Sequence, residues 1–222
     1  MDSFLNWLND IGGPVSGILV LMALVAASMI CFKLLQFWYL RPAANAKPQE
    51  LVRLFADDKP SQLRLLAKGQ RNSHVRLIEQ TQELLEQGAL TGDVLKAELF
   101  RRARLAIAPL ETHLRPLEVI AVIAPLLGLF GTVLGMIDAF RAMEAAGSQV
   151  NPSVLSGGIW EALLTTAIGL AVAIPVTMIH SALERKVDVT AANIQNDIEQ
   201  MLAIQVQKKH LNTKSANIRS VS

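Results

Sequence analysis

Three long stretches of this sequence contain no Asp, Glu, Lys or Arg, and they restrict what the chain can fold into. They run from Ile11 to Phe32, from Val119 to Ile137 and from Ala162 to Leu183, with lengths of 22, 19 and 22 residues. About 20 mostly apolar residues are enough for a helix to cross the hydrocarbon core of a bilayer. One such run fits a buried helix of a soluble protein, but three in 222 residues do not. The sequence therefore predicts an all-α integral membrane protein with three transmembrane helices.

Composition supports this class and indicates that the chain is not an enzyme. Charged residues make up 18% of the chain, against about a quarter in an average soluble domain. The single cysteine, Cys31, excludes a disulfide framework and a cysteine-cluster metal site. There is no glycine-rich phosphate loop, and the four histidines lack the spacing of metal ligands. We therefore expect no catalytic residues, no metal and no cofactor.

The positive charges are distributed unevenly. Residues 1–32 contain no Lys or Arg, which argues against a cleaved signal peptide and for a retained first helix. Fourteen Lys and Arg lie in 33–115, one lies between the second and third runs, and six follow from Arg185. The positive-inside rule then places the N-terminus in the periplasm and the C-terminus in the cytoplasm. The cluster Arg101, Arg102 and Arg104 is interpreted as a solvated helix face or one near anionic lipid headgroups, and no nucleic-acid partner is expected.

These observations define seven segments. They are a periplasmic N-terminus (1–10), a first transmembrane helix (11–40), a cytoplasmic helical region (41–116), a second transmembrane helix (117–141), a periplasmic loop (142–155), a third transmembrane helix (156–183), and a cytoplasmic helical extension and tail (184–222).

Helical periodicity continues outside the membrane. The cytoplasmic region is expected to contain helices around 51–55, over 61–68 and over 73–87, with Gly88 as a stop. Thr91 is expected to cap a fourth helix that leads into the second span, and Pro109 and Pro116 should kink or interrupt it. The amphipathic pattern of 187–207 predicts that the third membrane helix continues well beyond the bilayer, whereas residues from Leu211 on are expected to be disordered.

Small residues mark the faces on which the second and third spans should pack. Gly128, Gly131 and Gly135 recur at helical spacing in the second span, and Gly169 lies in the third. Small side chains let two helix backbones approach closely in a membrane. We predict that these four glycines form packing surfaces.

A few polar side chains lie within or at the edge of these spans. Glu161 bounds the third span at its outer end, and Thr165 follows one turn later on the same face. Thr166 is about 140° round the helix from Glu161, and Thr132 is the hydroxyl of the second span. An interfacial Glu161 that reaches water and a Thr132 that bonds to its own helix are alternatives for these residues. If the four side chains face a shared interior, they form a proton pathway that lines a pore. Because three helices cannot enclose a pore alone, we then expect a homo-oligomer.

The stretches Ala124–Phe140 and Ser156–Pro175 resemble the MotA/TolQ/ExbB proton channel family, most closely its ExbB branch. The first stretch contains Ala-Pro-Leu-Leu-Gly-Leu-Phe-Gly-Thr-Val-Leu-Gly-Met, and the family's channel residues map onto Thr132, Glu161 and Thr166. The sequence departs from the family at His180 and Ser181, where Tyr-Asn is usual.

The resemblance implies an inner-membrane pentamer around two helices of an ExbD-like single-span partner, with a TonB-like protein that carries the work to outer-membrane receptors. Protons would drive uptake of siderophores, haem or vitamin B12. Two alternatives remain: a TolQ-like subunit that serves outer-membrane integrity and division, and a non-conducting membrane scaffold that contacts lipid and protein only.

Overall fold

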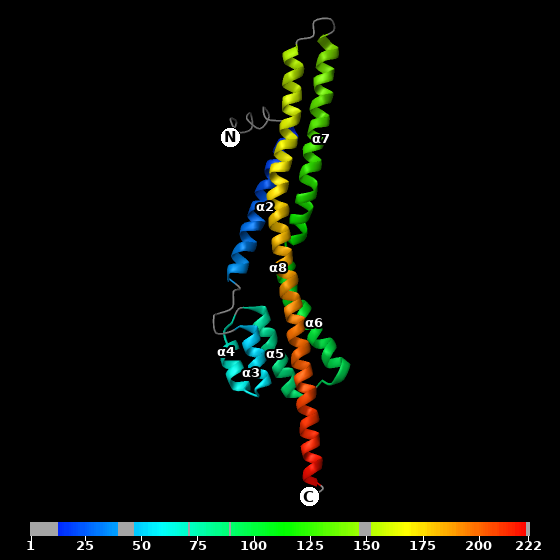
Figure 1. The fold of residues 1–222 in the computed structure, drawn as a ribbon. Coiled ribbons are helices and arrows are strands. Elements are labelled where there is room, and N and C mark those ends of the chain that lie inside the picture. The colour runs from blue at the N-terminus through cyan, green and yellow to red at the C-terminus, as the bar shows by residue number, and fades with distance from the viewer. Residues whose placement is uncertain (1–12, 40–46, 71, 89, 147–151, 221–222) are drawn as a thin grey trace. The chain divides into compact units, whose positions relative to one another are not determined.

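The computed structural model describes residues 13–39, 47–70, 72–88, 90–146 and 152–220. All regular secondary structure in these ranges is helical, so the predicted all-α class is confirmed. The helices in Figure 1 are α2 (Gly13–Tyr39), α3 (Pro48–Ala56), α4 (Pro60–Ala67), α5 (Ser73–Gln87), α6 (Gly92–Glu111), α7 (Leu114–Ala146) and α8 (Pro152–Ser220).

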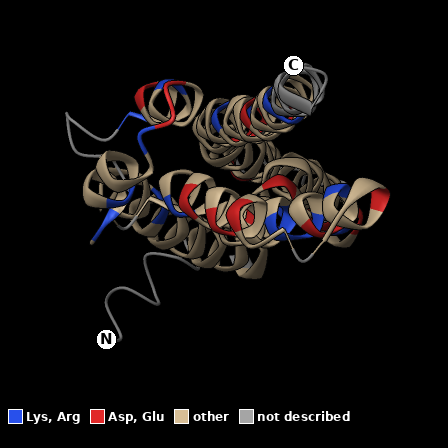
Figure 2. Ribbon diagram, turned by 90° about the horizontal axis from the view of Figure 1, so that it is seen from below, with Lys and Arg blue, Asp and Glu red and all other residues tan. Residues whose placement is uncertain are grey.

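Three of the helices are long and apolar enough to cross a membrane. The candidate spans are Pro14–Tyr39 in α2, Leu114–Ala145 in α7 and a part of Leu155–Leu211 in α8. They contain the second and third charge-free runs in full and residues 14–32 of the first run. In Figure 2 the charged residues gather on some helices, while long stretches of others are drawn entirely in tan. The prediction of three membrane-crossing helices is therefore confirmed by length and composition.

The chain divides into two compact units. The first unit comprises Met1–Leu34 and His113–Glu184, and the second comprises Leu35–Thr112 and Arg185–Ser222. Helix α8 contributes its N-terminal part to the first unit and its C-terminal part to the second. The predicted continuation of the third hydrophobic helix is thus observed as one unbroken element.

Helices α7 and α8 pack antiparallel in the first unit. Gly128 of α7 lies against Gly169 of α8. Two turns later in α7, Gly135 lies against Ala162, which precedes Gly169 by two turns in α8. Helix α2 joins them through a buried apolar cluster that also includes residues of α7 and α8. Its fully or nearly buried members are Val15, Leu19, Ala124 and Ala173.

The second unit contains α3, α4, α5, α6 and the C-terminal part of α8. The side chain of Asn72 caps α5 by accepting hydrogen bonds from the backbone N–H groups of His74 and Val75. The same helix ends where Gly88 takes a left-handed conformation with φ 61°. His74 is buried, and its Nε2 lies 2.9 Å from Oδ2 of Asp197 in α8. This pair joins two segments that are 123 residues apart in the chain.

The break between α6 and α7 differs in position from the prolines that were expected to cause it. Pro109 lies inside α6, and Pro116 lies in the first turn of α7. The interruption falls between them at Thr112 and His113, where His113 adopts φ 68°. Pro109 offers no N–H to the preceding turn, yet α6 continues past it to Glu111, so neither proline marks the break itself.

The expected disorder from Leu211 on is wrong. Helix α8 continues to Ser220. Residues 211–220 contain neither Gly nor Pro, so nothing in their sequence forces the helix to stop.

Candidate functional site

The candidate site depends on how closely α7 and α8 approach. A Cβ atom added at Gly169 would lie 2.7 Å from the backbone oxygen of Ala124, and one at Gly128 would lie 3.0 Å from the backbone of Thr165. At Gly131 the nearest atom would be Oγ1 of Thr165, at 2.6 Å. These distances are shorter than ordinary van der Waals contact. Only glycine fits at these positions without a shift of the neighbouring helix or side chain.

This close approach brings two threonine hydroxyls of α8 to one carbonyl of α7. Oγ1 of Thr166 donates to the backbone oxygen of Gly128 at 2.9 Å. Oγ1 of Thr165 lies 3.3 Å from the same oxygen and 2.7 Å from that of Ala162 in its own helix. Thr165 is buried, with 2% of its surface exposed. A Cβ at Gly128 would push α7 and α8 apart. The contacts of the two hydroxyls with the Gly128 carbonyl therefore depend on glycine at this position.

Glu161 and Thr165 line the same cavity. The cavity has a volume of about 320 Å³ and lies among α2, α7 and α8 in the first unit. Gly131 and Gly135 form part of its wall on α7, where the absence of side chains leaves the space open. Glu161 is half-buried, whereas Thr165 is fully enclosed. A carboxylate and a hydroxyl thus share one small space with mostly apolar walls.

Thr132 is placed differently from the other candidate residues. Its Oγ1 donates to the backbone oxygen of Leu129 at 2.6 Å, so the hydroxyl bonds to its own helix. It is half-buried and does not line the cavity that contains Glu161. Within one chain, Thr132 therefore does not meet Glu161.

Asp138 lines the same cavity as Glu161 and was missed as a candidate. Its side chain is 75% exposed, and Oδ1 lies 3.8 Å from Nη1 of Arg141. The sequence contained a signal for it, because Asp138 and Glu161 are the charged residues that end the second run and begin the third. Two antiparallel helices joined by a short connection bring such residues to the same level.

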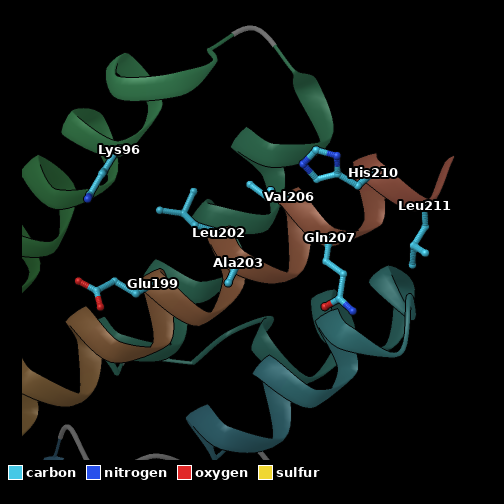
Figure 3. Close-up of a pocket in the computed structure, with 8 residues that line it drawn as sticks. All are labelled: Lys96, Glu199, Leu202, Ala203, Val206, Gln207, His210 and Leu211. Atoms are coloured by element: carbon cyan, nitrogen blue, oxygen red, sulfur yellow. The ribbon is translucent and has the colours of Figure 1, made fainter. Parts of the chain in front are cut away.

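A larger cavity in the second unit has different chemistry. It measures about 740 Å³, and Figure 3 shows residues of α8 together with Lys96 of α6 around it. Leu202, Ala203 and Val206 provide apolar side chains, while Lys96 and Glu199 carry opposite charges. The space is therefore mainly apolar, and we do not regard it as the candidate site.

His180 is buried near the end of the α8 segment that belongs to the first unit. It is 8% exposed, and its Nδ1 lies 3.9 Å from Oε2 of Glu184, one turn further along the helix. This places it about five turns from Glu161 along α8. The two groups therefore do not belong to one local cluster.

The site combines carboxyl and hydroxyl groups. Glu161 and Asp138 line the cavity with their carboxyl groups, and the hydroxyls of Thr165 and Thr166, which can donate and accept hydrogen bonds, lie at the Gly128 carbonyl. Among the described residues, no group of three or more His, Cys, Asp or Glu has the arrangement of a metal site.

The sequence matches the MotA/TolQ/ExbB proton channel family over residues 62–196, which is more than half of the chain. This range contains α7 and the part of α8 that carries Glu161 and both threonines.

Individual relatives carry names from two branches. The chain is 41% identical over 85 residues to the biopolymer transport protein exbB1 of Vibrio cholerae, which covers 38% of this chain and 37% of that protein. It is 38% identical over 98 residues to the Tol-Pal system protein TolQ of Haemophilus influenzae, with coverages of 44% and 42%. It is 32% identical over 147 residues to the biopolymer transport protein ExbB of Salmonella typhimurium, with coverages of 64% and 60%. The matches span about two fifths to three fifths of the length of these relatives.

Proposed function

Because this chain belongs to the MotA/TolQ/ExbB proton channel family, which is a family of channel subunits and not of enzymes, we propose that it is an ExbB-like motor subunit. In this role it uses the proton motive force, together with an ExbD-like partner, to energise TonB-dependent uptake across the outer membrane. The observation that carries the proposal is the cavity in which Glu161 and the buried Thr165 lie together between α7 and α8.

The proposed assembly is a pentamer in the bacterial inner membrane, with the N-terminus in the periplasm and the C-terminus in the cytoplasm. The charge distribution supports this orientation, because twenty of the 21 Lys and Arg residues fall on the cytoplasmic side. Two membrane helices of the partner occupy the centre of the ring. Each carries an aspartate that takes up and releases the proton.

In this proposal Glu161 exchanges protons with the partner near the outer end of α8. The hydroxyls of Thr165 and Thr166 are held by the Gly128 carbonyl and offer further contacts along the path. Thr132 faces the partner when the ring is assembled, although in the single chain it bonds to its own helix. One charge that crosses 100 mV releases about 2.3 kcal/mol, which is available for movement of the partner relative to the ring. Gly128, Gly131, Gly135 and Gly169 keep α7 and α8 close enough for this arrangement.

Asp138 is expected to assist proton entry without being essential. Its carboxylate adds negative charge to the cavity of Glu161 and so raises the local concentration of protons. The change Asp138→Asn should lower proton flux about two- to fivefold at low ionic strength, and the difference should shrink in high salt because salt screens surface charges. Flux into partner-containing vesicles measures this.

The control for Asp138 is Glu144→Gln. Glu144 is an exposed carboxylate on the same helix and does not line the cavity. Equal flux in both variants, with no dependence on salt, would show that Asp138 has no part in proton entry.

Growth under two kinds of stress tests which branch the protein serves. The host lacks its own ExbB and TolQ proteins and receives this chain with its ExbD-like partner. The ExbB-like role predicts growth on a siderophore as the iron source, without recovery of detergent resistance. Recovery of detergent resistance alone would identify the TolQ-like role, which the similarity to TolQ supports as the second candidate. Recovery of neither would favour a non-conducting scaffold.

A further inference from the structure

A cavity between α5 and α6 in the second unit has hydrogen-bond donors on part of its wall and the apolar side chains of Leu77, Leu105 and Ala106 on the rest. Its volume is about 240 Å³. Helix α5 contributes Ser73, Arg76 and Gln80 to the lining, and α6 contributes Arg102. Residues 73, 76 and 80 lie on one face of α5 because they are separated by three and four positions. Of the basic cluster Arg101, Arg102 and Arg104 on α6, only Arg102 lines this cavity, where it is joined by Arg76 of α5.

The lining has the chemistry of an anion site. Two guanidinium groups, a hydroxyl and a side-chain amide are all hydrogen-bond donors, and no carboxylate occurs among the lining residues. Guanidinium groups match the geometry of phosphate oxygens through pairs of parallel N–H bonds. The cavity between α7 and α8, which holds Glu161 and Asp138, has the opposite character.

Glu98 on α6 pairs with the arginines beside the cavity. Glu98 accepts hydrogen bonds from Arg101 at 2.7 and 2.8 Å and from Nε of Arg102 at 2.8 Å. These bonds lower the pKa of the Glu98 carboxyl from 4.5 to about 2, so it is ionised at neutral pH. One negative charge is thus shared by two guanidinium groups. Arg76 is exposed, and none of the ion pairs within the described ranges includes it.

The size of the cavity restricts the ligand. Pockets for drug-sized molecules occupy roughly 300–1,000 Å³, and this cavity is smaller. Ser73 and Arg76 belong to the first turn of α5, where the helix dipole adds partial positive charge.

We propose that this cavity binds a single phosphate group, supplied by inorganic phosphate or by the headgroup of an anionic lipid. The site is separate from the proposed proton pathway, since its lining residues belong to the second unit. The ligand is held by Arg76 from α5 and Arg102 from α6, with Ser73 and Gln80 as further donors.

The test uses the full chain with its partner, in neutral detergent for one arm and in nanodiscs for the other. In detergent, the unfolding temperature is followed as sodium phosphate is added at pH 7, with sodium chloride at equal ionic strength as the reference. In nanodiscs, phosphatidylcholine alone is compared with phosphatidylcholine that contains phosphatidic acid. A phosphate-specific rise in detergent identifies the soluble ion as a ligand, and a rise only with phosphatidic acid identifies the lipid headgroup.

Arg76→Gln is the decisive variant. It should raise the concentration of phosphate or phosphatidic acid needed for half of the effect by about tenfold. The loss of one hydrogen bond to a charged group weakens binding by about this factor. Because Arg76 is exposed, the variant should unfold at the wild-type temperature when no ligand is present.

The matched control is Arg104→Gln. Arg104 is exposed on α6, two residues from Arg102, and is not part of the lining. It should respond like the wild type. The proposal is overturned if Arg76→Gln and Arg104→Gln behave alike, or if neither phosphate nor phosphatidic acid raises the unfolding temperature above its reference.

Discussion

Glu161→Gln is expected to abolish proton-driven uptake while the complex still assembles. Glutamine keeps the size and hydrogen-bonding reach of the side chain but does not take up or release a proton. Glu161 contributes the carboxyl group of α8 to the cavity that holds the buried hydroxyl of Thr165, whereas Asp138 lines the same cavity from α7 with a side chain that is 75% exposed. Loss of a positioned proton-transfer group commonly costs about a hundredfold or more in rate. The rate of siderophore uptake in cells measures this, with copurification of the partner as the test of assembly.

The control for this prediction is Glu199→Gln, which removes an exposed carboxylate from the second-unit part of the same helix. It should leave uptake near the wild-type rate. Wild-type uptake in the Glu161→Gln variant would make Glu161 an interfacial residue only. Loss of partner copurification would instead assign it a role in assembly.

Gly169→Ala is expected to destabilise the packing of α7 against α8. The new Cβ would lie 2.7 Å from the backbone oxygen of Ala124 and 3.1 Å from Cα of Gly128. Both atoms belong to the backbone of α7, so no side chain can turn aside and the whole helix must shift. Overpacking of this kind costs about 1–3 kcal/mol. We expect a lower unfolding temperature in detergent and a lower yield of complex.

Gly157→Ala provides the comparison in the same helix. A Cβ at Gly157 meets no atom within 4 Å, and alanine is favoured over glycine in a helix by about 0.5–1 kcal/mol. This variant should unfold at or above the wild-type temperature. If both variants unfold at the same temperature, the glycines of this face do not determine the packing.

The membrane helices and their glycine spacing could be read from the sequence because both depend on local pattern. A charge-free run of about 20 residues identifies a span without knowledge of its neighbours. The two ends of α5 also have local signals in the sequence, because Asn is a residue type that starts helices and Gly one that stops them, at Asn72 and Gly88 respectively.

Contacts between distant segments could not be predicted in the same way. The buried pair of His74 and Asp197 joins α5 to α8, and nothing in the surroundings of either residue indicates the other. The placement of Asp138 beside Glu161 depends on how two antiparallel helices align, which periodicity does not give. The left-handed backbone of His113 at the α6–α7 break likewise has no local signal in the sequence, since the residue is not a glycine.

Protons are proposed to cross the membrane through the assembly that Glu161 helps to form. The most direct test is proton flux into liposomes that contain this chain and its ExbD-like partner, with a potassium-diffusion potential as the driving force and a pH-sensitive dye inside. We expect flux with the wild-type chain, and flux at the level of protein-free liposomes with Glu161→Gln. Equal flux through both proteins would show that Glu161 is not part of the proton path.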